Sequence, residues 1–307
     1  MPEGHTLHRM AATFRRAMGG AVVAASSPQG RFADGAALLD GTRMVVADAH
    51  GKHLLLGFAD PGAAHDGGDA AGAVAPLEPA AVPRWLHVHL GLYGRFPVEQ
   101  GEAPPPQGAG RLLLTAHGPR GPAWALLRGP TACEVLDPDG AARLRSRLGP
   151  DPLREDADPQ TFYARVAASR APVGALLMHQ DVIAGLGNIY RAEVLYRAGL
   201  DPYAPGRTVD PDRLPLVWED SRRLLREGVR LGRIVTTEPE HRTGPGPEGR
   251  PLDHYVYGRA GLPCRLCGTP VATAVVEGRN LFWCPQCQAP GAAPPFQLPW
   301  LSSPRTR

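Results

Sequence analysis

Lys52 is the only lysine in this chain of 307 residues, and every other member of its 33 basic residues is an arginine. An ammonium can lose its proton and act as a nucleophile or base, whereas a guanidinium effectively cannot. The segment His50-Gly51-Lys52-His53 runs into three leucines, a pattern typical of a hairpin tip that enters a strand. We therefore expect Lys52 to lie at a surface and to be kept for its chemistry. The alternative is that this lysine persists by chance in an Arg-rich composition.

The N-terminus offers a second nitrogen nucleophile. Removal of Met1 would leave Pro2 with a secondary amine, followed by Glu3. An α-amino group with a pKa of about 8 is roughly one-tenth neutral at pH 7, against about one in 2500 for an ordinary lysine. Such an amine can form a Schiff base, and Glu3 can move protons beside it. The alternative is a plain helix start in which Glu3 complements the helix dipole.

Four of the five cysteines form two C-x2-C pairs 16 residues apart, namely Cys264, Cys267, Cys284 and Cys287. This spacing predicts a closed tetrahedral zinc site, and the metal supplies folding energy that so short a segment cannot obtain from a core. Two such pairs within one hairpin disfavour a redox role. Between the pairs, Arg279-Asn280 is predicted to form a tip, either contacting phosphates or simply solvated, and the isolated Cys133 is predicted to be a core residue.

A Gly-x-Gly-Asn turn, residues 185–188, joins two apolar segments where a helix is predicted to start. Glycines permit close backbone approach, and a helix N-terminus favours phosphate. Many helix hairpins carry this turn. Here, however, Asn188 is one of only two asparagines and is predicted to occupy the capping position.

Composition sets the broad class. The formal net charge of +3 permits an anionic partner without demanding one. No apolar run long enough to span a membrane appears, and the N-terminus lacks a secretory pattern, so a cytoplasmic protein is expected. The length predicts two or three domains.

The residue pattern predicts a helix over 3–18, then short strands typical of a sandwich or barrel, then helices. Loops are expected at 60–83 and 101–110, a linker at 233–256 and a disordered tail at 289–307. The expected strands are 42–47, 54–59, 85–90, 111–117, 123–127 and 133–136, and the expected helices are 140–148, 160–169, 172–179, 189–198 and 211–231.

Taken together, these motifs resemble the formamidopyrimidine-DNA glycosylase and endonuclease VIII family of DNA repair enzymes. The matching segments, in order, are Pro2-Glu3-Gly4, Gly51-Lys52-His53, residues 89–94, residues 185–191, and Val256-Tyr257-Gly258-Arg259 before the cysteines. The resemblance implies an α+β multidomain fold. A catalytic domain (1–136) would consist of an N-terminal helix and a two-sheet β-sandwich. A helix–two-turn–helix domain (137–232) and a C-terminal segment (233–307) with a zinc finger at about 254–288 would follow.

The resemblance also implies roles for single residues. The Pro2 nitrogen would attack the sugar of a flipped-out damaged nucleotide, with Glu3 as acid/base and Lys52 assisting proton transfer. Asn188, Arg279 and Arg259 would contact DNA, the first two at phosphates around the lesion. Leu92 and Tyr93 match side chains that fill the gap left by the extruded base. His87 and His89 alternate on the preceding strand, where a satisfied pair is expected rather than metal ligands.

The gap-filling triad departs from both familiar patterns. Enzymes for oxidised guanine typically have Met-Arg-Phe and the endonuclease VIII type Gln-Leu-Tyr, whereas this chain has Gly91-Leu92-Tyr93. The Leu-Tyr pair favours the second type. The prediction is a monomeric glycosylase and AP lyase for oxidised pyrimidines, associated with the nucleoid, that acts on damaged double-stranded DNA, with single-stranded DNA left open. The alternatives are a formamidopyrimidine and 8-oxoguanine glycosylase, or a non-catalytic damage-binding protein.

Overall fold

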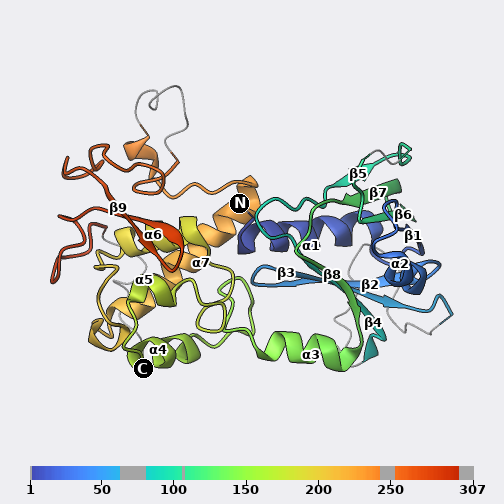
Figure 1. Cartoon of the computed structure of the whole chain (residues 1–307), viewed down its shortest axis with the longest axis horizontal. Coiled ribbons are helices and arrows are strands. Elements are labelled where there is room, and N and C mark those ends of the chain that lie inside the picture. Colours follow the sequence, from blue (N-terminus) through green and yellow to red (C-terminus); the bar gives the residue numbers. More distant parts are fainter. Residues whose placement is uncertain (1, 63–80, 106–107, 243–252, 297–307) are drawn as a thin grey trace. The chain divides into compact units, whose positions relative to one another are not determined.

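The computed structural model describes residues 2–62, 81–105, 108–242 and 253–296 and divides the chain into two compact units (Figure 1). The first unit is Met1–Arg147 and the second is Leu148–Arg307. Within the described residues, no helix is long and apolar enough to cross a membrane.

The first unit contains helix α1 (Gly4–Met18) and two four-stranded antiparallel sheets. One sheet has the order β1-β6-β7-β5 and the other β2-β3-β4-β8. The strands are β1 (Val23–Ser26), β2 (Arg43–His50), β3 (His53–Ala59), β4 (Arg84–His89), β5 (Val98–Gln100), β6 (Leu112–Gly118), β7 (Gly121–Leu127) and β8 (Ala132–Leu136). The two-sheet domain expected from the sequence is therefore confirmed.

A single apolar core joins α1 to both sheets. Leu7, Phe14 and Met18 recur at helical spacing and are at most 1% exposed. They pack with side chains such as Leu54 of β3 and Leu114 of β6. The alternation of buried and partly exposed residues along β2 gives one face to this core, as the strand period of two requires.

Helix α3 (Pro138–Ser146) belongs to the first unit. Its Ala141 and Leu144 cover Leu55 and Trp85 on the opposite face of the second sheet. Asp137 caps it by accepting the Gly140 N–H at 2.6 Å. The unit therefore extends eleven residues beyond the expected boundary at 136, because this helix is needed to cover a sheet face.

The second unit contains the helices α4 (Pro159–Ala167), α5 (Val173–Leu176), α6 (Asn188–Arg197) and α7 (Arg213–Leu231), followed by the hairpin strands β9 (Ala272–Val276) and β10 (Arg279–Trp283). Helix α6 is buried at every position except the partly exposed Ile189. Helix α7 is capped by Gly232, whose φ of 74° suits a left-handed cap. The helix expected over 172–179 is shorter, because residues after Leu176 form turns that lead to the Gly-x-Gly segment.

Two charged side chains of α6 join this helix to later segments. The Glu193 carboxylate accepts the backbone N–H groups of Tyr255, Val256 and Tyr257, each at 2.8 Å, and the hydroxyl of Thr236. Arg197, 1% exposed, donates to Asp220 at 2.6 Å and to Glu238 at 2.8 Å.

The C-terminal segment differs from its prediction. Residues 289–296 were expected to start a disordered tail, but the Phe296 ring lies 4.6 Å from the Arg197 guanidinium and 5.0 Å from the Tyr255 ring. Arg213 also donates to the Ala292 carbonyl at 2.9 Å. These contacts hold 289–296 against the second unit, so the prediction of disorder there is wrong. The rest of the expected tail and most of the loop at 60–83 lie outside the described residues.

Glu193→Gln should lower the free energy of unfolding of the protein by about 3 kcal/mol, because an amide nitrogen cannot accept the buried N–H groups that the carboxylate accepts. Urea-induced unfolding measures this change. The matched control is Glu227→Gln, which removes an exposed carboxylate bonded to Arg230 and should cost less than about 1 kcal/mol. Equal losses in the two variants would show that the Glu193 contacts do not stabilise the unit.

Candidate active site

The N-terminal residues lie at the start of α1. Glu3 is in extended conformation immediately before Gly4, its side chain is fully buried, and its carbonyl accepts the Thr6 N–H at 2.9 Å. His5, one residue inside the helix, is also buried. Burial, then the positive N-terminus and Arg9, lower the His5 pKa to about 4. The imidazole is therefore neutral at physiological pH.

Lys52 lies in a two-residue turn between β2 and β3, as its sequence context predicts. His50 pairs with His53 across the hairpin, so Gly51 and Lys52 are the two central residues. Gly51 has a φ of 57°, which glycine adopts without strain at the first central position of such a turn. The turn fixes the backbone of the only lysine at the end of the second sheet, and the Lys52 side chain is partly exposed.

Three histidines lie at the base of this hairpin. His53 and His87 share a hydrogen bond of 2.8 Å, His87 bonds to Glu134 at 2.8 Å, and the His89 ring centroid lies 5.0 Å from that of His53. Burial, then the neighbouring His87 and His89, lower the His53 pKa to about 3. His87 and His89 each have a side-chain partner, in agreement with the expected satisfied pair.

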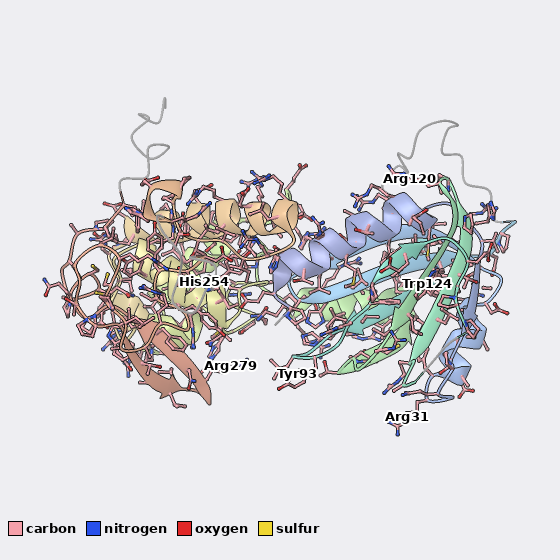
Figure 2. All side chains as sticks on the ribbon, turned by 90° about the horizontal axis from the view of Figure 1, so that it is seen from above. Arg31, Tyr93, Arg120, Trp124, His254 and Arg279 are labelled. Atoms are coloured by element: carbon pink, nitrogen blue, oxygen red, sulfur yellow. The ribbon has the colours of Figure 1, made fainter. Side chains whose placement is uncertain are left out.

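The loop that follows β4 presents two apolar side chains to solvent. Leu92 is 48% exposed and Tyr93 is 86% exposed. Figure 2 shows Tyr93 at an edge of the first unit, beyond the strand ends. Gly91 has a φ of +65°, and Gly94 closes the loop by donating to the Leu90 carbonyl at 2.9 Å. A tight turn therefore presents two large apolar groups to solvent.

In the second unit, Asn188 is the first residue of α6 and not its cap. Gly187 occupies the capping position, so the sequence prediction is wrong by one residue. The Asn188 side chain instead donates to the Asn280 carbonyl at 2.9 Å and accepts from Arg191. Arg191 also donates to the Asn280 carbonyl at 3.3 Å. These bonds join the start of α6 to the β9–β10 hairpin, so the structure brings Asn188 close to the segment that carries Arg279.

Arg279 is exposed at the first position of β10, directly after the hairpin turn (Figure 2). The turn itself is tied to the helical part by Glu277, whose carboxylate lies 3.0 Å from the His179 imidazole. Arg259 is engaged differently. Its guanidinium donates to the carbonyls of Tyr255 and Pro263, the latter at 2.9 Å, and so holds the segment that leads into the cysteines. A role for Arg259 in DNA binding stays a prediction.

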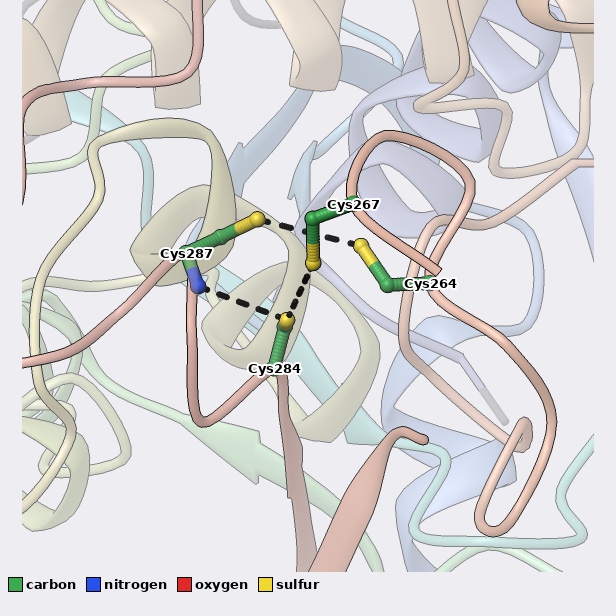
Figure 3. Close-up of side chains that lie close together, drawn as sticks. All are labelled: Cys264, Cys267, Cys284 and Cys287. Atoms are coloured by element: carbon green, nitrogen blue, oxygen red, sulfur yellow. Dashed lines mark hydrogen bonds between the residues drawn. The ribbon is translucent and has the colours of Figure 1, made fainter. Parts of the chain in front are cut away.

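The four paired cysteines converge, as Figure 3 shows. All four Sγ atoms lie within 4.8 Å of one another, with Cys264 and Cys287 at 3.8 Å and Cys267 and Cys284 at 3.5 Å. A tetrahedron with Zn–S bonds of about 2.3 Å has edges of about 3.8 Å, so the donor set fits zinc. Among the described residues this is the only group arranged to hold a metal ion. Four protein ligands leave no open position, so the site is structural.

Some residues that organise the site lie outside the matching motifs. One is Glu193, whose only sequence signal is that a charged residue on a buried helix must have buried partners. Thr131, which contacts the Gly91 loop, gave none. His179 likewise pairs with a residue 98 positions away.

Three family models match the chain: the formamidopyrimidine-DNA glycosylase N-terminal domain over 1–122, the formamidopyrimidine-DNA glycosylase H2TH domain over 148–240, and a zinc finger found in FPG and IleRS over 261–290. The chain is 45% identical over 297 residues to Endonuclease 8 1 of Mycobacterium tuberculosis, covering 94% of this chain and 100% of the relative. It is 35% identical over 263 residues to the formamidopyrimidine-DNA glycosylase of Thermus thermophilus, covering 83% and 86%.

Solved structures agree with these matches. The Thermus thermophilus MutM (Fpg) protein is similar with a TM-score of 0.66, 28% identity and coverage of 95% of this chain and 100% of that one. Lactococcus lactis Fpg, in a complex with a DNA that contains N7-benzyl-Fapy-dG, has the same fold with a TM-score of 0.71, 20% identity and coverage of 94% and 100%. With a structural zinc site, two antiparallel sheets and an H2TH domain, the chain belongs to the formamidopyrimidine-DNA glycosylase and endonuclease 8 family of DNA repair glycosylases.

Proposed function

We propose that the protein is a bifunctional DNA glycosylase and AP lyase that excises oxidised pyrimidines and then nicks the strand. The observation that carries the proposal is the Pro2 amine directly before the fully buried carboxyl group of Glu3, in a chain of this family. A carboxyl group next to the amine in the chain is suited to move protons while the amine attacks the sugar.

The Pro2 nitrogen attacks the sugar C1′ of a nucleotide that has been flipped out of the helix. The C1′–base bond breaks as the base takes up a proton, and the nitrogen loses its own proton. The C1′–O4′ bond then breaks with protonation of O4′, so that an iminium ion joins Pro2 to the opened sugar. Glu3 supplies the acid/base catalysis of this step, and Lys52 assists proton transfer. The iminium acidifies the C2′ proton, whose loss expels the 3′ phosphate. A second elimination expels the 5′ phosphate, and hydrolysis returns the amine.

The amine exists only when Met1 has been removed, because Met1 would acylate the Pro2 nitrogen. Small residues after an initiator methionine favour that removal, and Pro2 is such a residue. The proposal therefore includes a mature chain that starts at Pro2.

Damaged DNA is the proposed partner of both units. Arg279, exposed in the β9–β10 hairpin, supplies a charged contact to a phosphate, and Asn188 is hydrogen-bonded to the same hairpin. Leu92 and Tyr93 would enter the stack in place of the extruded nucleotide. Lactococcus lactis Fpg, which has this fold, was solved with DNA that contains N7-benzyl-Fapy-dG, and this supports a DNA-binding role for the fold.

The preference for oxidised pyrimidines rests on the Leu-Tyr pair and on the 45% identity to a protein named Endonuclease 8 1. The 35% identity to a formamidopyrimidine-DNA glycosylase supports the alternative substrate class, formamidopyrimidines and 8-oxoguanine. A non-catalytic damage-binding protein is disfavoured, because Pro2, Glu3 and Lys52 are all retained.

Borohydride should trap a covalent adduct between the protein and DNA with an abasic site, because it reduces the iminium. The intact mass should lack one Met residue, and Pro2→Gly should weaken the trapping. The matched controls carry the same short tag at either end of the chain. The C-terminal tag should leave trapping unchanged, and the N-terminal tag should abolish it because no amine remains on Pro2. Full nicking by a chain that retains Met1 would contradict the role of Pro2.

Arg279→Ala should weaken binding to every damaged duplex by a similar factor and make the slope of log K against log salt shallower by about one unit, because one phosphate contact is lost. Fluorescence anisotropy at several salt concentrations measures both. Arg120→Ala is the control, since Arg120 lies in the β6–β7 turn of the first unit and should leave the slope unchanged. A change in which lesion is bound best would refute a phosphate contact.

A further inference from the structure

Thr131 precedes β8 and contacts the exposed loop that contains Leu92 and Tyr93. Its hydroxyl lies 3.0 Å from the His89 carbonyl and 2.7 Å from His89 Nδ1, and its N–H donates to the His89 carbonyl at 2.9 Å. His89 Nδ1 in turn accepts the Gly91 N–H at 3.1 Å. A chain of hydrogen bonds therefore runs from Thr131 through His89 to the first residue of the loop.

The bond from Gly91 requires an unprotonated Nδ1 on His89. When Nδ1 accepts the Gly91 N–H, the imidazole is neutral with its proton on Nε2, and the single Thr131 hydroxyl proton points either to Nδ1 or to the His89 carbonyl. The environment favours this neutral form, since burial, then His87 and Lys52, lower the His89 pKa. The bond from Gly91 to His89 therefore forms only with the tautomer that is protonated on Nε2.

The Thr131 methyl group also occupies the space beside Gly91. A Cβ atom built on Gly91 would lie 2.4 Å from Thr131 Cγ2, which is closer than real Cβ contacts come. The positive φ of Gly91 adds strain for any other residue. Position 91 is the first of the three gap-filling positions, so the contact with Thr131 accounts for the missing side chain there.

We propose that Thr131 is a positioning residue of the Leu92–Tyr93 loop, and that its methyl group keeps any side chain out of position 91. The loop then enters the DNA stack with two side chains and leaves the base opposite the lesion without a contact from position 91. The inference rests on the proposed function and deepens it, because it names the residue that sets how the gap is filled.

A double-mutant cycle tests the proposal. Gly91→Ala should slow single-turnover excision from a thymine glycol duplex by about tenfold, because the added Cβ displaces the loop. Thr131→Ser keeps the hydroxyl and removes the methyl group, and alone should change the rate little. In the double variant the Cβ has room, so at least threefold of the loss should return. Thr131→Val, which lacks the hydroxyl, should slow duplex excision.

The controls distinguish displacement of the loop from backbone strain and from a change in the catalytic step. Gly129→Ala introduces the same positive-φ strain, since Gly129 has a φ of +60° and no atom closer than 3.9 Å to an added Cβ, and should have a small effect. Nicking of an abasic site in single-stranded DNA needs no gap filling, so Gly91→Ala should lower the ratio of the duplex rate to the single-strand rate, whereas Gly129→Ala should leave that ratio within about twofold of wild type. Absence of rescue in the double variant, or equal loss on single strands, would overturn the proposal. No nicking by the wild-type protein on either substrate would refute the proposed function instead.

Discussion

Helix α6 is the element on which the second unit depends, because three of its turns each hold a segment that comes later in the chain. Asn188 and Arg191 bind the β9–β10 hairpin, Glu193 binds residues 255–257, and the Tyr196 hydroxyl lies 3.2 Å from Cys264 Sγ. A zinc module of some 25 residues cannot form a core of its own. The contacts with the buried helix α6 therefore position the zinc module, and with it the exposed Arg279.

In the first unit, one packed core supports the N-terminal residues and the short loops at the strand ends. Its apolar core is shared by α1 and both sheets, so the N-terminal residues and the ends of β2, β3 and β4 rest on one packed body. The lysine hairpin needs a glycine with positive φ at 51, and the apolar loop needs one at 91. Histidines fill the region between them as neutral, hydrogen-bonded groups, and this avoids burying unpaired charge.

Much of this organisation could be predicted from the sequence, for particular reasons. The paired cysteines, the Lys52 hairpin and the strand alternation are local patterns, and local spacing determines what they form. β1 (Val23–Ser26) and helix α2 (Ala33–Leu39) were not predicted, because four residues and an Ala-rich stretch of seven carry too little periodicity. The Asn188 position, the docking of 289–296 and the Thr131 contact depend on partners 40 or more residues away, which no local pattern encodes.

We propose that Leu92 and Tyr93 fill the gap in the DNA while position 91 contributes no side chain that reads the opposite base. Single-turnover excision from matched duplexes, each with one lesion opposite each normal base, tests it most directly. We expect thymine glycol and dihydrouracil to be excised faster than 8-oxoguanine, with rates that vary by no more than about tenfold with the opposite base, since no bidentate contact discriminates between bases. A clear preference for 8-oxoguanine opposite cytosine would refute these roles for Gly91, Leu92 and Tyr93.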